Sequence, residues 1–168
     1  MQQDPNNFWE QLERLEKLIR ASELKAGIIF SFHSLILGLF VDRLDYFNNI
    51  FRGNIIFLIL VTFWILFVLI SIFYTFKCFM PRMELKFDKN VFFFRDAVNS
   101  YGDIKEYTKQ LTETCTDENK LFTQLSHQIF IESKIIDQKF KSVQQSLKYF
   151  AISFIFIILI IGFWVIKL

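Results

Sequence analysis

The chain has 168 residues, of which 53% are hydrophobic and 23 are phenylalanine, with a net charge of +2 and a mean hydropathy of +0.34. Soluble domains average about 45–50% apolar residues, so this composition favours a membrane protein. The near-neutral charge gives no support for nucleic-acid binding. The two cysteines, Cys78 and Cys115, lack any CxxC spacing and indicate free thiols in a reducing compartment.

Residues 1–21 are predicted to form an amphipathic helix in the cytosol. Asp4-Pro5 is a helix start signal, and apolar residues recur at helical spacing from Phe8 to Ile19. The other face alternates acidic and basic side chains. The segment as a whole does not have the basic start and apolar core of a signal peptide. Such a helix either packs against other cytosolic segments or lies on the membrane surface, and its mixed charge weakens the second interpretation.

Residues 22–42 are the first predicted transmembrane helix. Ser22 is a candidate N-cap, and a snorkelling Lys25 extends an apolar run that is shorter than the usual ~20 residues. Small residues spaced by three or four predict a thin face that another helix can approach closely; they are Gly27, Ser31, Ser34 and Gly38.

His33 lies in the middle of this predicted span. An ionisable side chain at that depth is a candidate functional group by default. The alternative is a neutral histidine that is hydrogen-bonded to a neighbouring helix.

The second predicted transmembrane helix is 55–79, preceded by an external loop at 43–54 whose aromatic residues suit a membrane interface. The run from Ile55 carries no charge before Lys77. It is long enough to cross a hydrocarbon core of roughly 30 Å. Pro81-Arg82 then marks a basic, helix-breaking boundary.

Residues 80–148 form the only sizeable polar region, predicted to be helical and cytosolic. Ser100 to Asp103 is a turn signal, Asp103 to Thr114 has helical periodicity, and Thr116-Asp117 is a candidate cap for the next helix. From Asp117 an amphipathic pattern continues without proline or glycine into the third predicted span, 149–168. The positions of this seam are Leu121, Leu125, Ile129, Glu132, Ile136, Phe140, Val143 and Leu147.

The predicted fold class is therefore an all-α membrane protein. It has three transmembrane helices, a small helical cytosolic region between the second and third, and a last helix continuous from cytosol into membrane. Lysine and arginine concentrate beside the N-terminal helix and at both ends of 80–148. By the positive-inside rule the N-terminus is cytoplasmic and the C-terminus periplasmic in a multi-pass inner-membrane protein.

Catalytic motifs are missing from the sequence, which has no GxSxG, HExxH, P-loop or GxGxxG pattern. His33 and His127 lie in different compartments by this topology. We therefore expect no catalytic residues, no metal site and no cofactor. The scarcity of charge within the spans argues against an ion-coupled transporter. The functional classes that remain are a membrane effector or sensor, a holin-like pore former and a structural scaffold.

Two stretches carry a resemblance to a known family. The first is the passage into the first span, Leu15 to Phe40, with its Lys25-Ala26-Gly27. The second comprises Pro81-Arg82, Val91 to Asp96, Glu106-Tyr107 with Leu111, and Lys148-Tyr149. Together they resemble the transmembrane effectors of the Pycsar antiphage systems, from which Ser22-Glu23-Leu24 and Arg95 depart.

The resemblance implies an antiphage defence effector. A neighbouring nucleotide cyclase would make a cyclic pyrimidine mononucleotide, cyclic UMP or cyclic CMP. The effector would respond by impairing the inner membrane, so that the cell dies by abortive infection. The alternative is a holin-like or scaffold membrane protein with no nucleotide ligand.

A cyclic nucleotide offers an anionic phosphate and a flat base, so its site needs cations and an aromatic platform. The candidate ligand-binding residues lie close together in the polar region, and Arg95 is favoured because it adjoins the aromatic cluster; they are Arg82, Phe93, Arg95, Tyr101, Tyr107 and Lys109. The alternative is that Phe92 to Phe94 and Tyr107 form the small core of this region.

A polar region of this size buries only a modest core. We therefore expect a homo-oligomer, in which the seam of the long helix finds a partner. Ligand binding would bias the stalk, and the continuous helix would pass that bias to 149–168.

Overall fold

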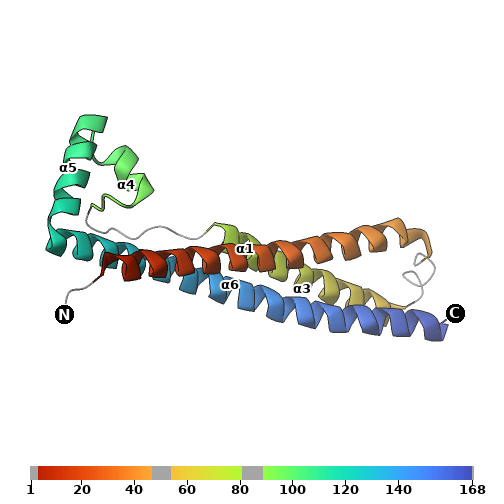
Figure 1. Ribbon diagram of the computed structural model, residues 1–168. Helices are drawn as coiled ribbons and strands as arrows, with labels where there is room; N and C mark the ends of the chain where they lie inside the picture. The colour runs from red at the N-terminus through yellow and green to blue at the C-terminus, as the bar shows by residue number, and fades with distance from the viewer. Residues whose placement is uncertain (1–3, 47–53, 81–88, 168) are drawn as a thin grey trace. The chain divides into compact units, whose positions relative to one another are not determined.

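The computed structural model describes residues 4–46, 54–80 and 89–167. Its helices are α1 (Pro5–Asp42), α3 (Ile55–Phe79), α4 (Phe94–Asn99), α5 (Ile104–Thr116) and α6 (Glu118–Lys167), as Figure 1 shows. No strand occurs in the described ranges, and α1, α3 and α6 are each long and apolar enough to cross a membrane. The predicted all-α class with three spanning helices is confirmed.

Helix α1 is one continuous helix of 38 residues, where the sequence suggested two pieces. It begins at Pro5, as predicted, and the Asp4 carboxylate accepts a hydrogen bond from the Asn6 amide at 2.9 Å. The prediction that Ser22 caps a second helix is wrong, because Ser22 lies inside α1 and is 1% exposed. Good helix formers and no proline or glycine surround it, so nothing interrupts the hydrogen-bond ladder there.

The starts of α5 and α6 follow the predicted signals. Asp103 Oδ1 accepts from the Glu106 amide at 2.9 Å, and Asp117 Oδ1 accepts from the Asn119 amide at 3.0 Å. Gly102 has φ of 71°, a left-handed conformation that glycine adopts without a Cβ clash. Helix α6 then runs unbroken for 50 residues, which confirms the continuous last helix.

The predicted seam of α6 holds at Leu125, Ile136 and Val143 but is wrong at Leu147, which is 53% exposed. The second half of the seam also buries three positions that were not predicted, Lys139, Ser142 and Ser146. These three positions follow a heptad spacing of about 3.5 residues, whereas the predicted seam positions have a longer mean spacing. Between membrane helices small residues mark the interface, so serine packs inward while leucine faces out.

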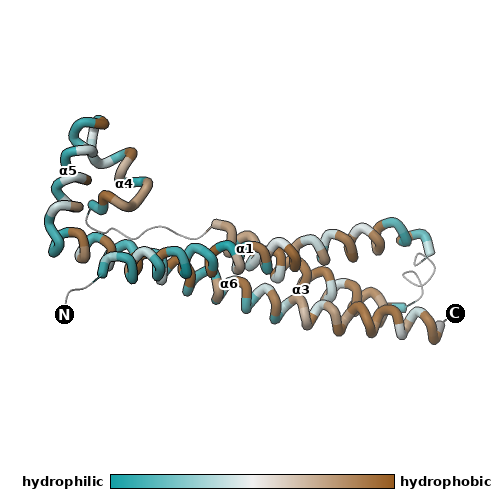
Figure 2. The backbone as a smooth tube through the Cα atoms, viewed as in Figure 1, coloured by the Kyte–Doolittle hydropathy of each residue, from teal (hydrophilic) through white to brown (hydrophobic). Residues whose placement is uncertain are grey.

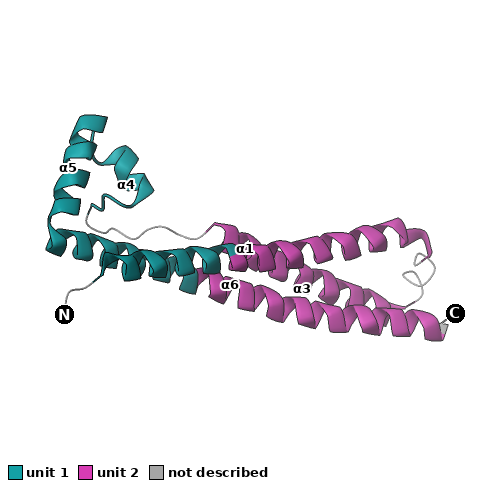
Figure 3. Ribbon diagram, viewed as in Figure 1, with its two compact units in different colours: residues 1–20, 82–137 teal, residues 21–81, 138–168 magenta. Residues whose placement is uncertain are grey.

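The chain divides into two compact units, shown in Figure 3. Unit 1 comprises residues 1–20 and 82–137. Within it the ring of Phe8 lies 5.2 Å from that of Phe122, and Trp9 packs edge-on against Phe92 at 5.3 Å. The N-terminal part of α1 therefore packs against the polar region, as the first interpretation of residues 1–21 expected.

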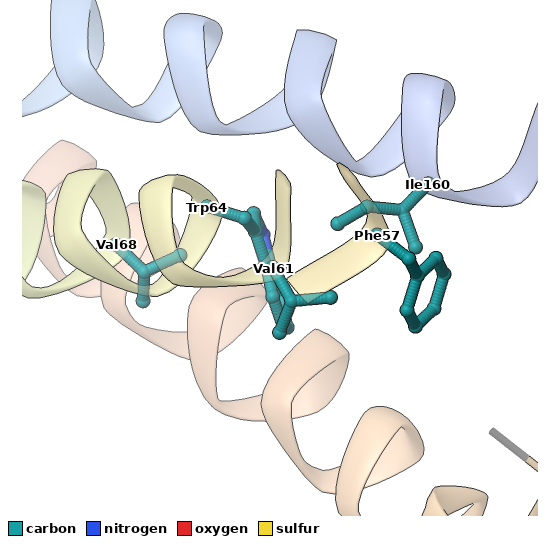
Figure 4. Packing of buried hydrophobic residues seen from close by; sticks show 5 residues of the cluster. All are labelled: Phe57, Val61, Trp64, Val68 and Ile160. Atoms are coloured by element: carbon teal, nitrogen blue, oxygen red, sulfur yellow. The ribbon is translucent and has the colours of Figure 1, made fainter. Parts of the chain in front are cut away.

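Unit 2 comprises residues 21–81 and 138–168 and is strongly apolar, as the brown colouring of α3 in Figure 2 shows. Its largest core cluster consists of Phe57, Val61, Trp64 and Val68 of α3 with Ile160 of α6, drawn in Figure 4. Side chains of α1 pack against this cluster, and the ring of Phe40 lies 4.8 Å from that of Trp64. We call these five clustered residues the apolar plug.

Two sequence predictions for the first span meet different outcomes. His33 is 1% exposed, but its Nε2 has no hydrogen-bond partner among the described residues, so the expected bond from this atom to a neighbouring helix is not observed. Of the small residues, Gly27 faces Phe79, whereas Ser31 and Ser34 are exposed and donate to their own helix at Gly27 O and Phe30 O. The face of α1 that carries these two serines is therefore exposed within a single chain.

Candidate functional site

A cavity of about 670 Å³ lies within unit 1. Its walls come from the segment before α4, the turn before α5, α5 itself and the first turns of α6. The lining residues are Lys89, Val91, Ser100, Tyr101, Glu106, Gln110, Glu113, Thr114, Asn119, Lys120, Thr123 and Gln124. We call it the unit 1 cavity.

Gln124 fastens the segment before α4 to α6. Its amide group donates to Lys89 O at 3.3 Å and accepts from the Val91 amide at 3.3 Å. The fully buried Asn90 donates to Gln124 O at 2.8 Å. Three hydrogen bonds thus hold an irregular stretch on the helix, which gives the cavity a defined wall.

Tyr101 supplies the aromatic surface of the cavity. Its ring lies 5.7 Å from that of Tyr107, whose hydroxyl donates to Val91 O at 3.2 Å. Burial, with Asp96 and Tyr107 nearby, raises the pKa of Tyr101. Its hydroxyl therefore stays protonated at neutral pH and can donate a hydrogen bond.

Two lysines bring positive charge to the cavity. Lys89 Nζ donates to Ser100 O at 3.1 Å. Lys120 forms an exposed ion pair with Glu113, which joins α5 to α6 around the corner at Asp117. The hydrogen bond from Lys120 lowers the pKa of Glu113, and the same bond raises the pKa of Lys120. Both groups are charged at neutral pH and open to solvent.

The structure brings only part of the predicted site together. Tyr101 lines the cavity and Tyr107 supports it from behind, whereas Phe93 and Arg95 do not line it. Lys109 lines a second, more open depression of about 900 Å³ along α5, which shares Glu113 and Lys120 with the unit 1 cavity. Arg82 falls outside the described residues.

Sequence reasoning missed the contribution of α6. The sequence pattern places Asn119, Lys120 and Thr123 on a long amphipathic helix and assigns them no ligand role, yet they line the cavity. The only available signal was a polar run directly after a helix cap, which is also typical of solvated helix starts. The alternative interpretation of the aromatic cluster holds in part, because Phe92 packs on Trp9 while Phe94 is 70% exposed.

The cavity is large enough for a small molecule, and its lining combines two lysines with the carboxylates of Glu106 and Glu113. Its volume lies within the range of about 300–1,000 Å³ that ligand sites occupy. Lysines bind phosphate as point charges, a tyrosine ring offers a stacking surface, and the amides of Gln110 and Asn119 offer donors and acceptors. Across the described residues, no group of three or more His, Cys, Asp or Glu side chains is placed to hold a metal ion.

Fold and site together define a helical protein, consistent with a multi-pass membrane protein, whose polar unit holds a ligand-sized cavity. The family model of the Pycsar effector protein domain matches residues 7–166, so the chain belongs to that family of antiphage defence effectors. No curated protein and no solved structure matches the chain.

Proposed function

We propose that a cyclic pyrimidine mononucleotide, cyclic UMP or cyclic CMP, binds the unit 1 cavity and switches the protein to a state that disrupts the inner membrane. A nucleotide cyclase is the functional partner that makes the ligand, and abortive infection is the outcome. Family membership supports the antiphage role. The observation that carries the ligand is the cavity of about 670 Å³, whose lining includes two lysines, a tyrosine and two glutamates.

In this proposal the cyclic phosphate lies between Lys89 and Lys120, and the base stacks on Tyr101. All three side chains line the same cavity. Charge-assisted hydrogen bonds to phosphate are stronger than neutral ones. Gln110 and Asn119, which also line the cavity, meet the polar edge of the base.

The ion pair between Lys120 and Glu113 offers a route from ligand to helix. A bound phosphate competes with the Glu113 carboxylate for Lys120, which weakens the link between α5 and α6. Helix α6 contributes Lys120 to the cavity and continues without a break to Lys167. A ligand that binds one arrangement of this corner more tightly shifts α6 toward that arrangement.

The topology that fits this role has the N-terminus and unit 1 in the cytoplasm and the C-terminus in the periplasm. The flanking lysines and arginines support it. A homo-oligomer is part of the proposal. A groove of about 600 Å³, lined by Gly27, Ser31 and apolar side chains of α1 with Phe79, offers a close-packing face to a second copy.

The test is calorimetry on the full chain in detergent with cyclic UMP, cyclic CMP, cyclic AMP and cyclic GMP. We expect Lys120→Ala and Tyr101→Ala each to weaken binding of the preferred nucleotide by on the order of tenfold or more, since one loses a charge-assisted bond and the other a stacking surface. Lys105→Ala is the matched control. It removes the same charge, and Lys105 lines the second depression but not the unit 1 cavity.

Equal losses from Lys105→Ala and Lys120→Ala would contradict the unit 1 cavity as the site, and would point to the second depression, which both lysines line, or to general electrostatic attraction. An absence of binding by all four nucleotides would contradict the ligand class and favour the holin-like or scaffold alternative.

A further inference from the structure

The interior of unit 2 is polar over one part of its length. Lys139, Ser142, Ser146 and Ser153 are all buried on one face of α6, with exposed fractions of 4% or less. From Lys139 to Ser153 the helix rises about 21 Å, at roughly 1.5 Å per residue. Burying a column of polar side chains in an apolar bundle is costly unless each of them is hydrogen-bonded.

All four side chains of this column are hydrogen-bonded, and Ser142 and Ser153 donate to carbonyls of their own helix. Lys139 Nζ donates to Glu23 Oε1 at 2.7 Å and to Cys78 O at 2.8 Å. One turn or two further along α6, the Ser146 hydroxyl lies 2.8 Å from Thr75 Oγ1 and donates to Ser71 O at 2.9 Å. Interhelical bonds of this kind join membrane helices, and their presence alone is explained by assembly of the bundle.

His33 is different, because it is buried and unsatisfied. It is 1% exposed, its ring lies edge-on against Phe150 at 5.0 Å, and its Nε2 finds no hydrogen-bond partner among the residues described. It lies about 12 Å along α1 from Lys25, the last charged residue before the apolar run. An orphaned ring nitrogen at this depth costs stability and contributes nothing to holding the helices together.

Beyond Ser153 the polar column ends at the apolar plug. Ile160 lies two turns further along α6 and packs with Phe57, Val61 and Trp64 of α3, as Figure 4 shows. Each of the five side chains of the apolar plug is at most 5% exposed. The column therefore runs from the ion pair of Glu23 and Lys139 at one end to the apolar plug at the other.

We propose that the polar column is a closed half-channel for protons, with His33 as the relay residue and the apolar plug as its gate. The membrane damage suggested under the proposed function is then, at its onset, a leak of protons through each bundle and not a wide pore. The proposed function supplies the trigger that loosens the plug. The proton path itself rests on the residues of unit 2.

The relay step is a proton exchange at the imidazole. When the plug loosens and water enters, a hydronium ion on the Lys139 side gives its proton to one ring nitrogen of His33. The other ring nitrogen gives its proton to a water beyond, and the ring returns to its starting tautomer by rotation. Histidine is suited to this step because its protonation changes near neutral pH. Metal cations have no such exchange with an imidazole, so the relay carries protons alone.

The test opens the plug by substitution, so that it does not depend on the ligand. The full chain, as Trp64→Ala or as Val61→Ser, is reconstituted in liposomes that hold a pH-sensitive dye, with valinomycin and potassium to balance charge. Circular dichroism in detergent checks folding, and Val61→Ser serves if Trp64→Ala does not fold. Each plug variant is compared with the same variant carrying His33→Phe. The control carries His127→Phe, at an exposed histidine of unit 1.

We expect the plug variants to leak protons while retaining trapped carboxyfluorescein. Adding His33→Phe should lower the proton flux at least about a hundredfold, the low end of what a positioned proton-transfer group contributes, and His127→Phe should leave it unchanged. Flux that is indifferent to His33→Phe, dye that escapes as fast as protons, or folded plug variants without any leak would each overturn the proposal. Ligand binding by calorimetry is unaffected by these outcomes, so failure here is distinct from failure of the proposed function.

Discussion

Removing the buried ammonium of Lys139 should destabilise the protein far more than removing an exposed one. The side chain is 4% exposed, and its Nζ donates to Glu23 Oε1 and to the carbonyl of Cys78 in the last turn of α3. Lys139→Met keeps the apolar stem and deletes both hydrogen bonds. It also removes a cation from a helix C-terminus, where positive charge is favourable.

The two lost contacts set the magnitude. A hydrogen bond that involves a charged group contributes about 1.5–3 kcal/mol, and a buried carbonyl left without a partner costs about 1–3 kcal/mol. Glu23 is 40% exposed and regains water, so its carboxylate adds little to the loss. We expect Lys139→Met to lower the free energy of unfolding by about 2–3 kcal/mol.

The assay is unfolding in mixed detergent micelles with increasing dodecyl sulfate, followed by circular dichroism. Lys148→Met is the control, because Lys148 is exposed on the same helix. The double variant Lys139→Met with Glu23→Gln should lose less than the sum of the two single losses, since the two side chains share one contact. A loss from Lys139→Met no larger than that from Lys148→Met would refute the assignment of Lys139 as a buried tie between helices.

Three further predictions concern unit 1. Asp103→Ala removes the cap that accepts from the Glu106 amide and should cost about 1 kcal/mol, seen as faster hydrogen exchange in the first turn of α5. Gly102→Ala places a Cβ on a residue with φ of 71° and should cost roughly 1 kcal/mol in the same unfolding titration, whereas Ser100→Ala in the same turn should cost less. Burial, with Glu16 nearby, raises the pKa of Glu132. The contribution of Glu132 to stability is therefore complete below the ordinary carboxyl pKa and is lost as the pH rises through the pKa of the folded state. Glu132→Gln should remove this pH dependence and stabilise the protein at neutral pH. An unchanged dependence of stability on pH in the variant would contradict the prediction.

Sequence reasoning predicted the structure correctly where a residue type favours one local conformation. Asp4, Asp103 and Asp117 each accept an amide hydrogen bond at a helix start, because a short carboxylate before a periodic run satisfies the orphan amides there. Long apolar runs likewise predicted the three spanning helices. Ser22 shows the limit of the same signal, since a serine also fits a helix interior when nothing else interrupts the ladder.

The candidate site depended on contacts that the sequence does not contain. Lys120 and Tyr101 line one cavity because α5 turns into α6 at Asp117 and Gln124 holds the segment before α4. Proximity in sequence had pointed instead to Arg95, which lies beside the aromatics in the chain yet does not line the cavity. Whether Leu147 or Ser146 faces the bundle likewise depends on which helices surround α6.

The claim that the unit 1 cavity controls the membrane is tested most directly by adding ligand to reconstituted protein. Wild-type chain in dye-loaded liposomes should dissipate a pH gradient on addition of cyclic UMP or cyclic CMP. Tyr101→Ala should fail to do so, and Lys105→Ala should respond like the wild type. A gradient that persists with every cyclic nucleotide, or that collapses equally in wild type and Tyr101→Ala, would contradict the account.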